Sequence, residues 1–258
     1  MGGGDDNKGA FRLAVLECDT PVPAVEQARG SYGEVFRQLL TKGLAGVHDN
    51  KFKGAEFALS KWDVVRSREY PKAEDVDGIL LTGSKHTAFA DDAWIVALVA
   101  YVKSFLETSS KPVVGICFGH QIIGRALGAA VGKSPGGWEL SVDKIEATDE
   151  GRKILGVSSL SLHQMHRDAV LEVPQGLVNL GRSPSCAIQG LYKPGHVISF
   201  QAHPEFDGFI MDEILKTRRD QGIFTDDMFA DGTSRAQRQH DGVLMATKIW
   251  EFLLATRA

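Results

Sequence analysis

Hydrophobic positions in the first half of the chain form short runs, separated by stretches with helical spacing. Three such runs are bounded by turn-forming or charged residues and predict buried strands, at residues 11–18, 57–65 and 77–84. A fourth leads from Pro112 to Cys117. Between the runs, apolar residues recur at helical spacing over 35–40 and 94–106, whereas residues 41–56 are typical of a loop. This alternation predicts an α/β fold with an open, mainly parallel sheet flanked by helices.

The pattern changes after Gly128. Residues 138–145 alternate between apolar and polar side chains, and shorter strand candidates recur at 160–162, 177–180, 187–192 and 196–201. We expect these strands to form a smaller antiparallel part on the same core. A helix from residue 207, a polar segment over 218–241 and a closing helix over 243–254 complete the chain. We therefore predict a disordered leader over 1–10, a main domain over 11–210 and a helical extension over 211–258 packed on that domain.

Composition and charge exclude several classes of protein. The chain of 258 residues has a formal net charge of −4 and no run of Lys and Arg, which argues against a nucleic-acid-binding protein. It has no signal-peptide core and no stretch of 18 apolar residues, so we expect no membrane association and a cytoplasmic protein, with the nucleus as the alternative. Three scattered cysteines suit neither a disulfide framework nor a zinc site, and we expect no metal and no cofactor. Residues 128–134 resemble a phosphate loop but have one residue too few between the glycines, so we interpret them as an ordinary loop.

One of these cysteines stands in a distinctive setting. Cys117 lies between Gly115 and Gly119, after a short apolar strand and before a predicted helix. Glycines two residues away on each side allow the tight strand–turn–helix corner that presents a nucleophile outward. At a helix N-terminus the thiolate is favoured, and the free backbone N–H groups there can receive an oxyanion. We therefore predict that Cys117 is a nucleophile, whereas Cys18 and Cys186 are buried apolar side chains.

A base and a carboxylate occur together 86 residues later. Pro204 favours an extended backbone at His203, so the side chains of His203 and Glu205 should project to the same side. The carboxylate can then accept a hydrogen bond from one ring nitrogen, which leaves the other nitrogen free to take a proton from a thiol. The chain thus contains the three groups of a Cys-His-Glu triad.

Gly115–Gln121, followed at this spacing by His203-Pro204-Glu205, resembles the class I glutamine amidotransferase family over roughly residues 11–210. The resemblance implies a flavodoxin-like sheet and hydrolysis of a γ-glutamyl amide through a thioester. It also implies that Cys117 is the nucleophile, His203 the base and Glu205 its orienting group. The oxyanion hole would be formed by the N–H groups of Phe118 and of Gly83 or Ser84. The implied substrate-binding residues are Gln121, Trp138, Glu139, Leu140 and His166.

The turn Thr82-Gly83-Ser84-Lys85-His86 departs from the Gly-Gly-Pro type of the large biosynthetic members. Together with its flanking segments, it is similar to the stand-alone, GMP-synthetase-like branch, in which some plant members are γ-glutamyl peptidases acting on glutathione conjugates. We expect no fused synthetase domain. Three alternatives stay open: a glutaminase that supplies ammonia to a protein partner, a γ-glutamyl peptidase acting on a small molecule, and a non-catalytic regulatory or binding protein on the same fold.

Overall fold

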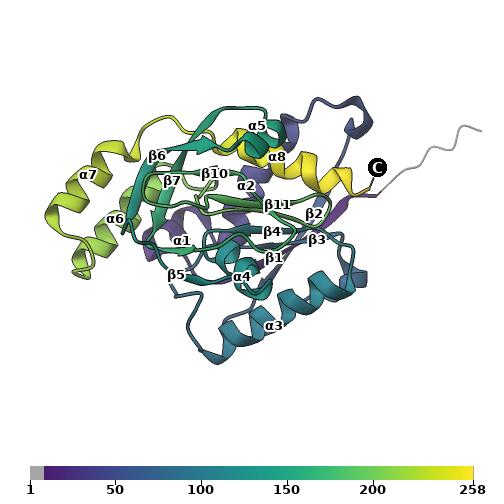
Figure 1. The fold of residues 1–258 in the computed structure, drawn as a ribbon, viewed down its shortest axis with the longest axis horizontal. Helices are drawn as coiled ribbons and strands as arrows, with labels where there is room; N and C mark the ends of the chain where they lie inside the picture. The colour runs from purple at the N-terminus through teal and green to yellow at the C-terminus, as the bar shows by residue number, and fades with distance from the viewer. Residues whose placement is uncertain (1–8, 258) are drawn as a thin grey trace, which may run out of the picture.

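A mixed sheet forms the centre of the protein in the computed structural model, which describes residues 9–257 (Figure 1). Five neighbouring strands run parallel, in the order β2 (Phe57–Asp63), β1 (Phe11–Glu17), β3 (Gly78–Leu81), β4 (Val113–Ile116) and β12 (Val197–Phe200). Antiparallel pairing then adds β11 (Gly190–Lys193) and β9 (Val178–Asn179). The predicted open, mainly parallel sheet is confirmed.

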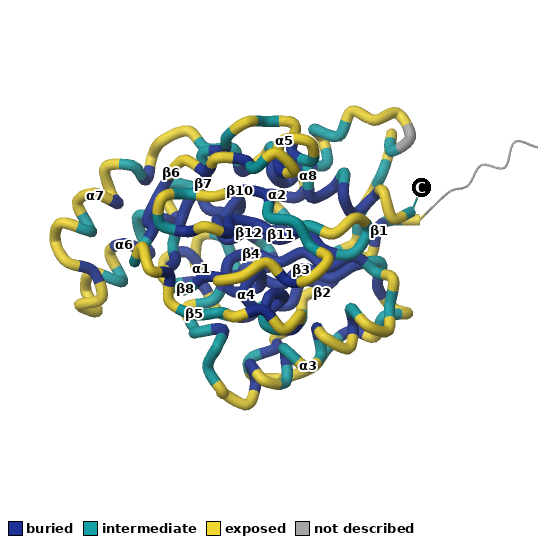
Figure 2. Tube along the Cα trace, in the orientation of Figure 1, coloured by how far each residue is buried: buried dark blue, intermediate teal, exposed yellow. Residues whose placement is uncertain are grey.

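Helices cover both faces of this sheet. One face carries α2 (Tyr32–Ala45) and α8 (Gly242–Ala255), and the other carries α3 (Ala93–Thr108) and α4 (Phe118–Ala126) (Figure 1). Along β1, Leu13 and Val15 belong to the apolar cluster that contains Trp250 of α8, whereas Leu16 belongs to the cluster that contains Leu98 of α3. The strands are therefore apolar on both sides, as expected for a sheet buried between two layers (Figure 2).

The second half of the chain adds small antiparallel sheets, as predicted. In one, β6 (Glu139–Ala147) pairs with β7 (Ser159–His166) and with β10 (Gly181–Arg182). In another, β5 (Val131–Lys133) pairs with β8 (Asp168–Val170), and α5 (Asp149–Leu155) connects β6 to β7. Glu139 lies opposite His166 in the β6–β7 register.

The structure corrects four local predictions. The segment 41–56 is not all loop, because α2 continues to Ala45 and a 3₁₀ turn occupies 50–52. Residues 128–134 include β5, which is stabilised by pairing with β8. The short helix α1 (Pro23–Arg29) was missed. The polar segment 218–241 contains α7 (Asp226–Ala236), which begins where the Thr225 side chain accepts a hydrogen bond from the N–H of Met228.

The C-terminal helices pack on the same body as the sheet. The indole N–H of Trp250 in α8 donates to the carbonyl oxygen of Leu40 in α2, at 2.8 Å. At one end of the molecule, α6 (Gly208–Asp220) and α7 lie side by side, close to α1 (Figure 1). Most of the predicted leader lies outside the described residues, and the proposed division at residue 210 stays a prediction. Within residues 9–257, no helix combines the length and the apolar character needed to span a bilayer.

Candidate active site

Three adjacent parallel strands deliver the predicted catalytic groups to one edge of the sheet. β3, β4 and β12 are neighbours, and they are followed by Gly83, Cys117 and His203 respectively. The hydrogen bonding between β4 and β12 extends one residue beyond the end of β4, because the N–H of Cys117 donates to the carbonyl oxygen of Phe200 at 2.8 Å. The carboxyl edge of a parallel sheet is where ligands bind in such folds.

Cys117 occupies a strained corner between β4 and α4. Its backbone has φ 51° and ψ −104°, a region that residues other than glycine rarely adopt. A Cβ atom at Gly119 would lie 2.5 Å from the carbonyl oxygen of Leu81, so only glycine allows the turn to press against β3. Phe118 is the first residue of α4, and its N–H therefore has no acceptor within the helix. This is the strand–turn–helix corner that the glycine spacing predicts.

His203 is held on several sides. Its Nδ1 lies 2.8 Å from Oε1 of Glu205, and because a carboxylate only accepts, Nδ1 carries the proton. Its backbone N–H donates to the carbonyl oxygen of His163 at 2.8 Å. The ring of Phe206 stacks on the imidazole, with centroids 4.0 Å apart and planes 9° apart. The Cys117 side chain lies near the imidazole, because a Cβ atom at Gly83 would come within 2.7 Å of Cε1 of His203 and within 3.7 Å of Cβ of Cys117.

The environment favours the charged form of His203. Burial by itself lowers the pKa of the imidazole, but the negative charge of Glu205 and that of a Cys117 thiolate raise it, together with hydrogen bonds to both residues. The net effect is a His203 pKa above its ordinary value. The arrangement thus suits a charged imidazolium at His203.

The turn after β3 lies directly against this pair. A Cβ atom at Gly83 would stand 2.7 Å from Cε1 of His203 and 3.7 Å from Cβ of Cys117. Gly83 therefore lies beside both predicted catalytic side chains, at the position where the family resemblance implies one side of an oxyanion hole.

Cys117 lines a cavity of about 320 Å³. Of the predicted substrate-binding residues, Gln121, Trp138 and His166 also line it. The side-chain amide of Gln121 donates to the carbonyl oxygen of Asp168 at 2.7 Å and to Oε1 of Gln201 at 3.1 Å, which fixes its orientation. The structure thus places these three side chains and the predicted nucleophile in the lining of one cavity.

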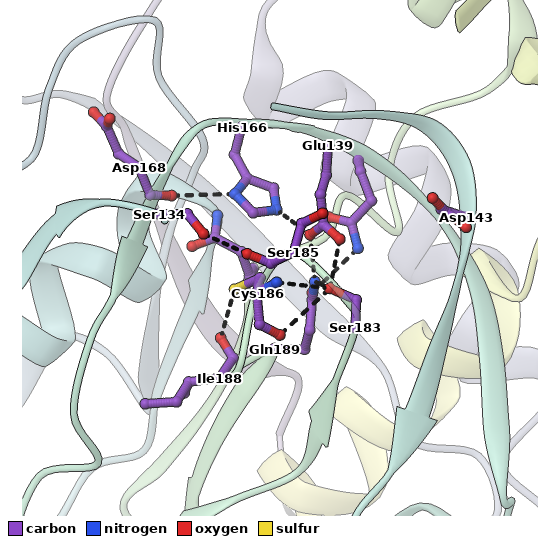
Figure 3. Close-up of polar contacts among 12 residues, drawn as sticks. Ser134, Glu139, Asp143, His166, Asp168, Ser183, Ser185, Cys186, Ile188 and Gln189 are labelled. Atoms are coloured by element: carbon purple, nitrogen blue, oxygen red, sulfur yellow. Dashed lines mark hydrogen bonds and ion pairs between the residues drawn. The ribbon is translucent and has the colours of Figure 1, made fainter. Parts of the chain in front are cut away.

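Glu139 and Leu140, in contrast, are not among the residues that line this cavity. Leu140 is buried in an apolar cluster with Phe206. Glu139 is buried behind the cavity wall, where its carboxylate lies 2.9 Å from Nε2 of His166 and accepts from Nε2 of Gln189 at 2.7 Å and from the Ser183 hydroxyl (Figure 3). Glu139 thus faces protein side chains, not the cavity.

Electrostatics explain why Glu139 tolerates burial. Burial alone would raise the pKa of the Glu139 carboxyl, but hydrogen bonds from His166, Ser183 and Gln189 outweigh that effect and lower it. Nδ1 of His166 lies 3.1 Å from the carbonyl oxygen of Asp168, so both edges of the ring are held. This network orients His166 in the cavity wall.

Cys186 lies next to that network. Ligand atoms of Glu139, His166 and Cys186 lie within 4.8 Å of one another, a spacing compatible with a metal ion. However, Glu139 and His166 are already bonded to each other, and the Cys186 thiol points at the carbonyl oxygen of Ile188, 3.4 Å away. Burial raises the pKa of Cys186 to about 12, so this thiol is neutral. The donors of the cluster are satisfied by protein groups, and we assign no metal to it.

Comparisons with known proteins agree with the geometry. The family model for "Glutamine amidotransferase class-I" matches residues 47–217, a span that includes Cys117, His203 and Glu205. The chain belongs to the class I glutamine amidotransferase family.

Similar members of this family differ in their named activities. A glutamine amidotransferase-like protein of Schizosaccharomyces pombe is 32% identical over 256 residues, covering 95% of this chain and 99% of its own. Gamma-glutamyl peptidase 3 of Arabidopsis thaliana is 31% identical over 222 residues, covering 81% and 82%. Among solved structures, a glutamine amidotransferase of Thermotoga maritima has a TM-score of 0.73 at 17% identity, covering 95% of this chain and 99% of its own. The comparisons thus support an amidohydrolase but leave its substrate open.

Sequence reasoning missed some residues of the cavity wall. Met165, Arg167 and Arg218 all line the cavity that contains Cys117. Arg218 comes from α6, and only the packing of α6 against α1 and α7 brings it there. Basic residues are common in the last turn of surface helices, so the sequence alone does not show that Arg218 lines a cavity.

Proposed function

We propose that the protein hydrolyses γ-glutamyl amide bonds through a Cys117 thioester. The observation that carries this proposal is the arrangement of Cys117, His203 and Glu205: His203 Nδ1 lies 2.8 Å from Glu205, and the turn at Gly83 abuts both the imidazole and Cys117. These groups have the order nucleophile, base and orienting carboxylate that activates a thiol.

The reaction proceeds in two stages, acylation of Cys117 and hydrolysis of the thioester. The Cys117 thiolate attacks the γ-carbonyl carbon, and the tetrahedral intermediate collapses as the C–N bond breaks and His203 gives its proton to the departing amine. His203 then takes a proton from a water molecule, and the resulting hydroxide attacks the thioester. Glutamate leaves, and the thiolate and imidazolium are restored.

We assign the oxyanion hole to the N–H of Phe118 and that of Gly83 or Ser84. The first N–H lies at the start of α4, where it has no helical acceptor, and the second lies on the turn that abuts both reacting side chains. The cavity of about 320 Å³ next to Cys117, with Gln121, Trp138 and His166 in its wall, would take the γ-glutamyl group.

Turnover by the purified protein tests the proposal. Incubation with glutamine and with glutathione should release ammonia and cysteinylglycine, respectively, from at least one donor. Cys117→Ser should lower that rate by about 10⁴-fold or more, because the nucleophile is lost. Cys18→Ala, which removes another buried thiol, should keep the rate. Mass spectrometry of acid-quenched protein should show the γ-glutamyl adduct on Cys117.

The alternatives predict different results. If no γ-glutamyl donor shows Cys117-dependent turnover and no adduct forms, the proposal is wrong and a non-catalytic binding protein is favoured. A glutaminase for a separate acceptor would hydrolyse glutamine and would co-purify with its protein partner.

A further inference from the structure

A second cavity, of about 360 Å³, adjoins the one that contains Cys117. The two share four lining residues, Ser84, Lys85, Met165 and Arg218. The second cavity lies between the segment that follows β1 and the helix α6, with Tyr32 on one side and Ile214 and Thr217 on the other. The two cavities are thus neighbouring compartments of one cleft.

The reacting groups are divided between these compartments. Cys117 lines the first cavity but not the second, whereas His203 lines the second but not the first. In the proposed reaction, the acyl group stays on the thiol while His203 gives its proton to the departing amine. The departing amine must therefore lie on the His203 side, which is the side of the second cavity.

We propose that the second cavity binds the leaving group, and that this group is an amino acid or a short peptide with a free carboxylate. This inference rests on the proposed γ-glutamyl hydrolase function. It names the class of donor that the site is built for, namely γ-glutamyl peptides in preference to glutamine.

Size supports this assignment. Ammonia is about as large as water, whose share of liquid volume is ~30 Å³. A compartment of about 360 Å³ is far larger than such a leaving group needs and lies in the ordinary range for small-molecule sites. Its walls include the apolar side chains of Phe206 and Ile214, which suit the body of an amino acid.

The lining of the second cavity carries two cations, Lys85 and Arg218, and two carboxylates, Asp19 and Glu26. Among residues 9–257, no ion pair joins the guanidinium of Arg218 to a carboxylate, whereas its neighbour Arg219 pairs with Asp226 at 2.8 Å. Lys85, the other cation common to both cavities, is already paired with Asp19. Arg218 is therefore the cation available to bind an anionic substrate group, and a guanidinium matches a carboxylate with two parallel hydrogen bonds.

The walls of the second cavity come from widely separated parts of the chain. The family model matches residues 47–217, but Tyr32 and Pro21 precede that span and Arg218 and Gln221 follow it. The nucleophile and its base thus belong to the matched region, while two walls of the second cavity lie outside it. This gives the C-terminal part of the chain a role in choosing the donor.

Filling the cavity provides the first test. Thr217 lines only the second cavity, and its hydroxyl bonds the carbonyl oxygen of Glu213 within the same helix. Thr217→Trp should lower kcat/KM for glutathione by about 10²-fold while changing glutamine hydrolysis by less than about threefold. Lys216→Trp is the matched control: the neighbouring residue is exposed, lines neither cavity, and should leave both rates unchanged.

Removing the cation provides the second test, which does not depend on how Thr217→Trp folds. Arg218→Gln should raise KM for glutathione by about 10- to 100-fold, the loss of a charge-assisted hydrogen bond. It should raise KM much less for glutathione whose C-terminal carboxylate is converted to an amide. The difference between the two peptides isolates carboxylate recognition from any general effect on the fold.

The outcomes separate this inference from the proposed function. If the wild type hydrolyses glutamine but no γ-glutamyl peptide, or if both variants affect glutamine and both peptides equally, the leaving-group assignment is wrong while the hydrolase proposal stands. If no donor is hydrolysed, the hydrolase proposal fails first and the assignment falls with it.

Discussion

Gly83→Ala perturbs the proposed active site by a single methyl group. The added Cβ would stand 2.7 Å from Cε1 of His203, whereas ordinary van der Waals contact begins at 3.4 Å. Either the imidazole or the turn after β3 must therefore move by about 0.7 Å. His203 is held by Glu205 and by the Phe206 stack, so the movement will disturb either the His203–Cys117 contact or the proposed oxyanion N–H.

The expected loss follows from that displacement. A misplacement of about 1 Å costs roughly 10²-fold in rate, and loss of one oxyanion donor costs about 10²- to 10³-fold. We expect kcat to fall by about 10²-fold with glutamine and with glutathione alike, because both share the acyl half. The backbone of Gly83 is not in the left-handed region, so alanine should cause little change in thermal unfolding.

Steady-state kinetics with both donors, beside a thermal melt, check this prediction. Gly132→Ala is the matched control, since its Cβ would approach only the tip of Leu171, at 3.2 Å, on a strand that lines neither cavity. A Gly83→Ala enzyme that keeps a wild-type kcat would refute the argument that this turn must lie against His203. A fall in kcat that is matched by unfolding would refute it equally.

Two further perturbations test other contacts. Phe206→Leu removes the ring stacked on His203 and should destabilise the imidazolium by about 0.5–1 kcal/mol. The His203 pKa should therefore fall. In a pH series of Cys117 alkylation by iodoacetamide, the alkaline limb of the rate profile should move toward lower pH. Phe206→Tyr should keep the wild-type profile, and an unmoved limb in the leucine variant would contradict the stacking role. For Asp77, burial raises the pKa, but hydrogen bonds from Arg12 and Arg257 lower it from 3.8 to about 2. Asp77→Asn should therefore lose about 1–2 kcal/mol of unfolding free energy at pH 7 in urea melts, and the difference should shrink to a small fraction as pH falls from about 4 to 2. A difference that keeps its full size at pH 2 would rule out this linkage.

Local signals predicted much of the framework. Apolar runs located the strands of the main sheet, and the glycines around Cys117 predicted the corner on which it lies, because both depend on the nearest neighbours in the chain. The His203-Pro204-Glu205 spacing likewise predicted the imidazole–carboxylate contact, which is 2.8 Å long. Errors arose where a segment depends on distant partners, as β5 depends on pairing with β8.

The sequence by itself therefore determined the chemistry that we propose at Cys117, since the proposed nucleophile, base and carboxylate each sit in a motif of a few residues. Only the tertiary structure decided what surrounds that chemistry. The β6–β7 register turned Glu139 toward His166 and away from the cavity. The packing of α6 brought Arg218 within reach of the same cavity as Tyr32, 186 residues earlier in the chain. Such neighbours are set by how buried faces pack, and no short stretch of sequence encodes them.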